Sequence, residues 1–339
     1  MRLVLGAARY TRAGPVAMFV TVAAWLCLAL ASLLPAGAMV AQVKTPMRII
    51  VGFAAGGSSD IAARLIADKL KDALGVPVIV ENRVGAGGRI AAEALKNAPA
   101  DGASFMLVPV VVPVLAPLVY KQLPYDPAHD FAPVSQVATY GFGLAVGASH
   151  PAKNFPELVA WLKANPAQAN FGSPAPGSLP HFFGLMIGRA IGVEVTHVAY
   201  KGGAPLAADL MGGQLPVGID SLSDQVELHR AGKIRILATS GAQRSAVLPE
   251  VPTFREQGFP AIEGIGWIGV YAPAKTPPAI VAQVSAAIAA ALKSPDIAER
   301  MLKLGYEPTG TTPAELAAIM AADAARWGPI IKASGFTGD

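Results

Sequence analysis

Along this chain, short apolar runs of strand length alternate with amphipathic segments of helical period. The run 48–53 (RIIVGF) is apolar after its arginine, as expected of a strand that is buried on both faces. Ile61, Leu65, Ile66 and Leu70 then follow at helical spacing. The alternation continues with strands predicted over 76–82 and 104–112 and a helix predicted over 87–98. This order predicts a parallel sheet with helices on both faces.

The alternation pauses in the proline-rich stretch 123–133 (LPYDPAHDFAP) and then starts again. Further strands are predicted over 142–149, 169–174, 194–200, 215–221 and 234–240, and helices over 155–165, 179–192 and 204–213. Two separate series of this kind predict two α/β lobes, which a chain of 339 residues is long enough to form.

The C-terminal part of the chain is helical in pattern and rich in alanine. Thr312, Pro313 and Glu315 form a capping box, in which the threonine caps the helix and the glutamate reaches back to the cap. A helical tail of this kind is most simply a cover for one of the two lobes.

Residues 1–41 have the features of an export signal. Their positive start comes from three arginines, Arg2, Arg9 and Arg12, after which the segment carries no charge. Small residues at Ala36 and Ala38 form an A-x-A site, which predicts cleavage after Ala38 or, alternatively, after Ala41. The other interpretation is an uncleaved anchor, because an apolar run of about 20 residues can span a bilayer.

The mature chain left by this cleavage carries almost no net charge. The full sequence has 27 Lys and Arg against 23 Asp and Glu, and the loss of three arginines leaves a net charge of +1. A nucleic-acid partner is not expected, because it would require clustered basic residues. The only cysteine, Cys27, also lies in the leader, beside a Leu26 too large for a lipidation site. The mature fold therefore depends on its hydrophobic core, without disulfides.

A glycine- and serine-rich turn joins a predicted strand to a predicted helix within 51–65 (VGFAAGGSSDIAARL). Gly52 and Gly57 have the spacing of a P-loop, but Ser58 stands where the phosphate-binding lysine is required. A second glycine-rich stretch, 84–91 (VGAGGRIA), lacks the last glycine of the dinucleotide-binding fingerprint. Neither stretch therefore predicts a nucleotide site.

The first turn still shares one physical property with the P-loop and the dinucleotide-binding motif. A loop that opens a helix presents free backbone N–H groups at the positive end of the helix dipole, which favours an anion. The stretch 172–184 (GSPAPGSLPHFFG) offers the same arrangement in the second series. Two such loops predict a shared carboxylate site, although each serine could simply cap its helix. Asp60, in the first helical turn, either caps that helix or holds water or a ligand amine.

The mature chain offers no recognisable catalytic group. It has no cysteine nucleophile and no G-x-S-x-G motif. The histidines lack metal-ligand spacing, so neither a metal nor a cofactor is expected; they are His129, His150, His181, His197 and His229. His181 follows the second loop and is a possible ligand contact. A triad of Ser178, His181 and Asp220 is the remaining catalytic interpretation. Phe53, beside the first loop, either walls a cleft or belongs to the core.

Five stretches of the chain, in order, resemble those of one protein family. They are 48–70, 75–88, 123–131, 198–215 and 231–260. Over residues 46–335 the chain resembles the Bug proteins, which are the extracytoplasmic solute-binding receptors of tripartite tricarboxylate transporters. The resemblance implies two doubly wound α/β lobes with an interlobe cleft, as in periplasmic binding proteins. Lobe one would combine 43–142 with 267–339, and lobe two would be 143–266.

The resemblance also implies a ligand and the residues that bind it. The ligand would be a small organic carboxylate in the interlobe cleft, held by backbone amides, small hydroxyl residues and bridging waters. Carried to the matching positions of this sequence, the ligand-binding residues are Phe53, Gly57, Ser58, Ser59, Asp60, Ser173, Ala175, Gly177, Ser178 and Asp220.

The sequence departs from the family pattern at several of these places. Ala54 and Ala55 replace the usual paired prolines of the first loop, which predicts a less rigid loop. Pro176 brings no amide donor to the second loop. Ser221 stands where asparagine is frequent, and Arg89 stands where asparagine is common. Arg89 is a possible contact for an acidic ligand or a solvated surface residue.

The sequence therefore predicts a periplasmic solute-binding protein and not an enzyme. It would capture a small organic carboxylate between two lobes and deliver it to the membrane subunits of a tripartite tricarboxylate transporter, or to a sensor. It is expected to act as a monomer. Two alternatives remain open: a secreted α/β enzyme acting on a small carboxylate, and a membrane-anchored scaffold with a vestigial cleft.

Overall fold

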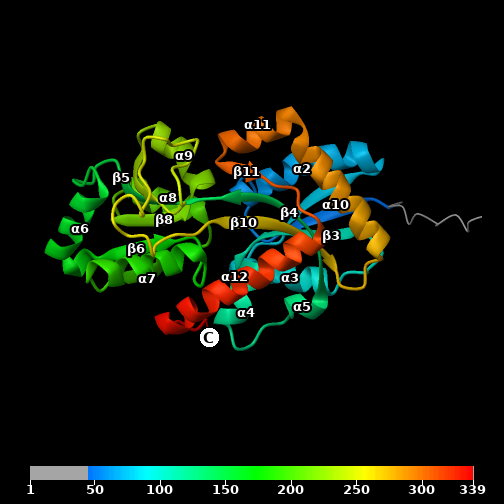
Figure 1. Ribbon diagram of the computed structural model, residues 1–339, viewed down its shortest axis with the longest axis horizontal. Coiled ribbons are helices and arrows are strands. Elements are labelled where there is room, and N and C mark those ends of the chain that lie inside the picture. Colours follow the sequence, from blue (N-terminus) through cyan, green and yellow to red (C-terminus); the bar gives the residue numbers. More distant parts are fainter. Residues whose placement is uncertain (1–44, 339) are drawn as a thin grey trace, which may run out of the picture. The chain divides into compact units, whose positions relative to one another are not determined.

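Two separate β-sheets surrounded by helices form the computed structural model, which describes residues 45–338 (Figure 1). The strands of the first sheet are β1 (Met47–Val51), β2 (Val78–Asn82), β3 (Ser104–Pro109), β4 (Phe131–Tyr140), β10 (Gly266–Pro273) and β11 (Tyr306–Pro308). Those of the second are β5 (Phe142–Gly147), β6 (Asn170–Ser173), β7 (Thr196–Ala199), β8 (Val217–Ser221) and β9 (Ile234–Thr239). The predicted leader and its cleavage site lie outside the described residues.

Helices flank both sheets. Those of the first part are α2 (Ser58–Leu74), η1 (Ala86–Gly88), α3 (Arg89–Lys96), η2 (Val111–Leu115), α4 (Ala116–Val119), α5 (Pro127–Asp130), α10 (Pro278–Lys293), α11 (Pro295–Lys303) and α12 (Pro313–Ser334). Those of the second part are α6 (Phe155–Ala164), η3 (Pro166–Gln168), α7 (Leu179–Ile191), α8 (Gly203–Met211) and α9 (Leu222–Arg230). The α/β fold class with two lobes is thus confirmed.

Each sheet contains one doubly wound unit. The strand order is β11-β4-β10-β3-β1-β2 in the first sheet and β7-β6-β8-β5-β9 in the second. β2 and β3 both pair in parallel with β1, on its two sides. β7 and β8 flank β6 in the same way. Right-handed crossovers then place successive helices on opposite faces, and ligands of such sheets bind at the carboxyl ends of the strands where the winding reverses.

The sheets are mixed, so the predicted parallel pairing holds for β1, β2 and β3 and for β6, β7 and β8 but not for the other strands. β10 runs antiparallel to β3 and β4, and β5 runs antiparallel to β8 and β9. The reason lies in the chain path. β5 follows β4 directly and β10 returns from the second sheet, so each enters its sheet from the end at which the parallel strands finish.

The strand predicted over 104–112 is also shorter than expected. β3 ends at Pro109, and η2 begins at Val111 as a single π-helical turn. Pro113 lies in that turn and cannot donate a hydrogen bond to a strand ladder. The apolar run alone did not reveal this change, because strands and buried helical turns have similar composition.

The two connections between the sheets are joined to each other by Ser240. Its amide donates to the Phe142 carbonyl, at 2.9 Å, and its hydroxyl donates to the Gly264 carbonyl, at 2.7 Å. Gly266 has no room for a side chain, because a Cβ there would lie 2.6 Å from the Tyr140 ring and 2.7 Å from the Phe142 ring. This buried cluster is where the chain passes between the lobes.

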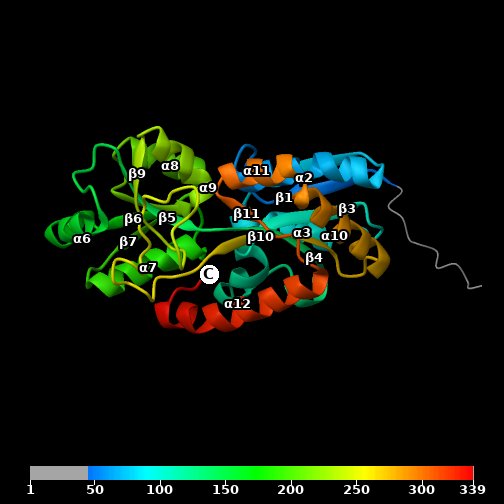
Figure 2. The same ribbon diagram turned by 45° about the horizontal axis from the view of Figure 1, so that its top comes forward.

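Helix α12 contacts both lobes, so the prediction that the tail covers one lobe was wrong. Its predicted capping box is present, with Thr312 and Glu315 satisfying each other's backbone amides. The helix packs along β4 and reaches α7, as Figures 1 and 2 both show. Beyond its end, the Phe336 ring lies edge-on to His181 with centroids 4.5 Å apart. The C-terminal segment therefore joins the two lobes.

Helices α2, α10 and α11 pack against one another beside the first sheet (Figure 2). The core-facing residues of α10 include Ile280, Val284 and Ile288, which are all buried. Among residues 45–338, no single helix is long and apolar enough to cross a membrane; α10 and α11 reach that length only together, with a bend of 74° between them.

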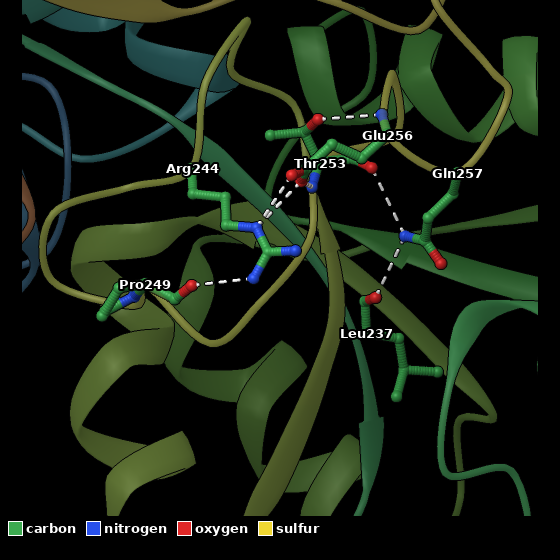
Figure 3. Close-up of polar contacts among 6 residues, drawn as sticks. All are labelled: Leu237, Arg244, Pro249, Thr253, Glu256 and Gln257. Carbon is green, nitrogen blue, oxygen red and sulfur yellow. Dashed lines mark hydrogen bonds and ion pairs between the residues drawn. The ribbon is translucent and has the colours of Figure 1, made fainter.

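The long loop after β9 is held by polar contacts, as Figure 3 shows. Arg244 Nε donates to both carboxylate oxygens of Glu256, at 2.9 and 3.0 Å. Glu256 also accepts the Thr253 amide at 2.7 Å, and these contacts lower the pKa of its carboxyl. Gln257 donates to the Leu237 carbonyl at 3.3 Å. The polar residues of this loop, within one of the five family-like stretches, thus stabilise its conformation.

Candidate ligand-binding site

A cavity of about 510 Å³ lies where the carboxyl ends of parallel strands of both sheets meet. Residues after β1 and β3 line it from the first sheet, and residues after β6, β7 and β8 line it from the second. Seven of the predicted ligand-binding residues contribute to the lining: Phe53, Gly57, Ser58, Ser59, Ala175, Ser178 and Asp220. This position agrees with the switch-point rule for doubly wound sheets.

The first loop ends at Gly57, the N-cap of α2. Gly57 has an extended backbone and makes no side-chain cap, and its own amide donates to the Ala54 carbonyl at 3.2 Å. The amides of Ser58 and Ser59 belong to the first helical turn and have no intrahelical acceptor. Both residues line the cavity at the positive end of α2, where the Ser58 amide also faces the Asp224 carboxylate, and a helix end of this kind favours an anion.

Asp60 lies outside the cavity lining and fixes the conformation of the first loop through hydrogen bonds. It accepts hydrogen bonds from the Gly56 amide, from Arg64 and from Asn82, each at 2.9 Å. Burial opposes its ionisation, but these hydrogen bonds outweigh burial and lower the pKa of its carboxyl. Gly56 has a φ of +80°, which glycine adopts without strain. Asp60 is thus a structural cap.

The second loop precedes α7, whose N-cap is Ser178. The Ser178 hydroxyl donates to the Ala175 carbonyl at 2.6 Å, and the Ser173 hydroxyl donates to the same carbonyl at 3.0 Å. The Gly177 amide donates to Nδ1 of His181 at 3.1 Å. Ser173, Gly177 and His181 are therefore outside the cavity lining and fix the loop from its buried side.

These contacts leave no catalytic triad. Ser178 bonds to a carbonyl and His181 to an amide, so neither is paired with the other. Within residues 45–338 there is also no group of three His, Cys, Asp or Glu residues placed to hold a metal ion. The site can bind an anion through main-chain amides, and Ser178 and His181 do not form a nucleophile–base pair in it.

The buried His181 and the partly buried His197 stack behind the second loop. Their ring centroids are 3.9 Å apart, and His197 Nε2 lies 2.7 Å from the Ser173 hydroxyl. Burial, together with the neighbouring His197, lowers the pKa of His181 to about 3. Burial lowers the pKa of His197 to about 4. Both rings are therefore neutral in the folded protein at physiological pH.

This stack predicts a loss of stability in mild acid. The unfolded chain takes up protons on both histidines as the pH falls through 6.5, whereas the folded chain does so only near pH 4 and pH 3. Between pH 7 and pH 5 each histidine should therefore lower the free energy of unfolding by about 2 kcal/mol. Urea denaturation at both pH values measures this loss.

A matched pair of variants isolates the contribution of one ring. His197→Gln keeps a polar atom near Ser173 but cannot titrate, so its free energy of unfolding should fall less between pH 7 and pH 5 than that of the wild type. The exposed His129→Gln serves as the control and should keep the wild-type slope. Equal slopes for all three proteins would disprove the role of the stack.

The sequence reading missed a third loop at the cavity. Lys201 and Gly202 lie between β7 and α8, Gly203 is the first residue of α8, and all three contribute to the lining. The signal was present, because a Lys-Gly-Gly turn follows a predicted strand and precedes a predicted helix. Since the N-termini of α2, α7, α8 and α9 all border the cavity, four helix dipoles favour negative charge there.

A second acidic residue, Asp224, was also missed. It lies in α9, a helix that the sequence did not predict, which begins directly after the strand β8 that carries Asp220. Its Oδ2 accepts hydrogen bonds from the Ser221 hydroxyl at 2.9 Å and from the Ser58 hydroxyl at 3.3 Å. The bond to Ser58 crosses the cavity from one sheet to the other. It joins the two lobes at the predicted site.

Burial raises the pKa of both aspartates. For Asp220 the charge of Asp224 acts in the same direction, whereas the Ser221 amide opposes it. For Asp224 the hydrogen bonds from Ser221 and Ser58 oppose the effect of burial. The lobe-two wall of the cavity thus carries two carboxyl groups that repel each other when both are ionised.

Arg89 lies away from the cavity lining. Its guanidinium stacks on the Tyr120 ring, 3.6 Å from the ring centroid. Its Nη1 is buried without a hydrogen-bond partner in the described part of the chain. A cation over an aromatic face is attracted by the ring quadrupole, so Arg89 packs within the first lobe.

Comparison with known proteins identifies the family. A sequence profile described as the tripartite tricarboxylate transporter family receptor, TctC, matches residues 62–336. The chain belongs to this receptor family. The family consists of solute-binding proteins and is not an enzyme family, so the enzyme alternative is set aside. Its members include periplasmic transporter binding proteins.

Members of the receptor family are similar to this chain over most of its length. Protein BugT of Bordetella pertussis is 33% identical over 291 residues, covering 86% of this chain and 89% of BugT. Rpa4515 of R. palustris, solved with adipate, is 34% identical with a TM-score of 0.84, covering 87% of this chain and 99% of the other. MatC of Rhodopseudomonas palustris, solved with malate, is 30% identical with a TM-score of 0.79, covering 85% and 99%.

Proposed function

We propose that this receptor captures a small organic carboxylate between its two lobes. The observation that carries the proposal is the cavity of about 510 Å³, which is bordered by the N-terminus of α2 from one lobe and by those of α7, α8 and α9 from the other. Helix N-termini stabilise anions without a basic side chain. Related receptors of known structure hold adipate and malate, which supports the same ligand class here.

The proposal includes the division of the chain and the partner. Lobe one would combine residues 43–142 with 267–339, lobe two would be 143–266, and ligand binding would close the lobes about their connections. The exported monomer, cleaved near Ala38 or Ala41, would present the closed form to the membrane subunits of a tripartite tricarboxylate transporter or to a sensor. The same carboxylate ligand would suit a transporter partner and a sensor partner equally.

A thermal-shift screen tests the binding function. Mono-, di- and tricarboxylates, amino acids and aromatic acids are added to protein that has been unfolded and refolded to remove carried-over ligand. A ligand at 100 times its dissociation constant should add about 2.7 kcal/mol of stability. The ligand recovered afterwards should have an unchanged mass. Stabilisation by no carboxylate, or conversion of the ligand into a product, would contradict the proposal.

A further inference from the structure

The two aspartates of the cavity face one glycine. A Cβ placed on Gly203 would lie 2.6 Å from Asp220 Oδ2 and 3.0 Å from Asp224 Oδ2. Both oxygens therefore lie close to one point at the N-terminus of α8. The absence of a side chain at Gly203 leaves space in front of them, and all three residues line the cavity.

One of these oxygens has an unused hydrogen-bonding capacity. Asp220 is only 3% exposed, and its Oδ1 accepts the Ser221 amide at 2.7 Å. Within residues 45–338 no donor contacts its Oδ2, which faces the cavity. This oxygen is not among the fully buried unpaired polar atoms of residues 45–338, so it is open to the cavity, where a bound molecule that supplies an N–H or O–H group can hydrogen-bond to it.

The charges of the lining also restrict the ligand. Among the cavity-lining residues, Asp220 and Asp224 are acidic and Lys201 is basic. Lys201 is exposed and forms no ion pair with either aspartate in the described part of the chain. Its charge is screened by solvent, so it offsets the aspartates weakly. A ligand carboxylate placed against the aspartates would meet like charge.

We propose that Asp220 and Asp224 form a hydrogen-bond-donor subsite, which selects small carboxylates that also carry a hydroxyl or ammonium group over unsubstituted mono- and dicarboxylates. This inference rests on the proposed function, because it assumes that the ligand carboxylate binds at the helix N-termini of the same cavity. The donor group of the ligand then lies at the lobe-two wall, in the space in front of Gly203.

Two matched ligand series test the subsite. In the first, butyrate, succinate, 4-hydroxybutyrate and 4-aminobutyrate share a four-carbon chain with a carboxylate at C1, and their C4 is a methyl, a second carboxylate, a hydroxymethyl or an aminomethyl group. In the second, succinate, malate and aspartate differ in the substituent on C2. Dissociation constants are measured by titration calorimetry at pH 7. In at least one series, the ligand with a hydroxyl or an ammonium group should bind at least ten-fold more tightly than butyrate and succinate. Comparing the hydroxyl-bearing ligand with the ammonium-bearing one then shows which donor the subsite prefers.

Variants show whether the aspartates cause this selectivity. Asp220→Asn and Asp224→Asn each remove one carboxyl group, and Gly203→Ala keeps both carboxyl groups but fills the space before them. Each should reduce the preference for the donor-bearing ligand at least five-fold. Asp68→Asn, an exposed charge on α2, is the matched control and should retain the full preference. Circular dichroism confirms that each variant is folded.

The outcomes separate this inference from the proposed function. If succinate or butyrate binds as tightly as every donor-bearing ligand, the subsite is disproved while carboxylate binding stands. The same holds if the preference survives in all three cavity variants. If none of these ligands binds and adipate and the rest of the carboxylate screen also fail, the proposed function fails and the subsite with it.

Discussion

Gly57→Val should weaken carboxylate binding at least 100-fold, which corresponds to about 2.7 kcal/mol of binding free energy. Gly57 is the N-cap of α2 and lines the cavity beside the amides of Ser58 and Ser59. The two methyl groups of valine would stand in the space through which a ligand carboxylate approaches those amides. The result should appear in calorimetric titration with the tightest ligand of the screen.

Folding should change much less than binding in this variant. Gly57 has φ −76° and ψ 166°, which valine adopts readily. A Cβ there would lie 3.2 Å from the Ala54 carbonyl oxygen, a tight contact that the exposed residues of the loop can relieve. The free energy of unfolding should therefore fall by about 1 kcal/mol or less.

The control for this substitution is Gly212→Val. Gly212 is exposed at the end of α8, has a negative φ of −75°, and would place its Cβ 3.3 Å from a backbone oxygen. It does not line the cavity. Gly212 therefore matches Gly57 in local crowding but lies outside the cavity. The Gly212→Val variant should bind the ligand with the affinity of the wild type. Unchanged affinity in folded Gly57→Val would show that the first loop does not contact the ligand.

Trp327→Ala should lower the free energy of unfolding by about 3–5 kcal/mol, the range for large aromatic side chains removed from a core. Trp327 lies on α12 and is 1% exposed. Its ring is perpendicular to Phe183 of α7, with centroids 5.8 Å apart, and it contacts Gly264 in the connection between the sheets. The substitution thus removes packing that joins α12, α7 and this connection.

Urea denaturation of Trp327→Ala is compared with that of Trp161→Ala. Trp161 is partly exposed on α6 and contacts His150 with centroids 4.7 Å apart, so less of its surface is buried. Its loss should be about 1–2 kcal/mol. Equal losses for the two variants would contradict the role assigned to α12 as a joint between the lobes.

The sequence predicted the elements of both lobes because their signals are local. Ile61, Leu65 and Leu70 of α2 repeat at helical spacing and are buried or nearly so in the structure, and the capping box at Thr312 forms as expected. The strand directions that the sequence did not predict depend on the path of the chain between the two sheets. The direction of β5 and β10 follows from where the chain enters each sheet, and no periodicity within those strands records it.

Part of the site was predicted because its signals are also local. A glycine-rich turn before a helix can be read locally, so Gly57, Ser58 and Ser178 were predicted and do line the cavity. Asp60 and His181 were included because they neighbour those turns, yet their side chains face Arg64 and Gly177. Which way a side chain points from a turn depends on tertiary contacts that one sequence does not contain.

Asp224, in contrast, lines the cavity but was not predicted. Nothing in its own stretch marks it as a ligand-binding residue, and its helix α9 has a mostly polar sequence. It reaches the cavity because β8 ends there and α9 begins at once, so that its carboxylate faces Ser58 of the other lobe. Such a contact between distant segments becomes visible only in the folded chain.

The most direct test is a crystal structure of the protein with the tightest ligand of the carboxylate screen. We expect an intact ligand inside the cavity, with a carboxylate within about 2.7–3.2 Å of donors from the α2 loop and, directly or through water, from a loop of the other lobe. A ligand bound elsewhere, a ligand held by one lobe alone, or a chemically altered ligand would contradict the account.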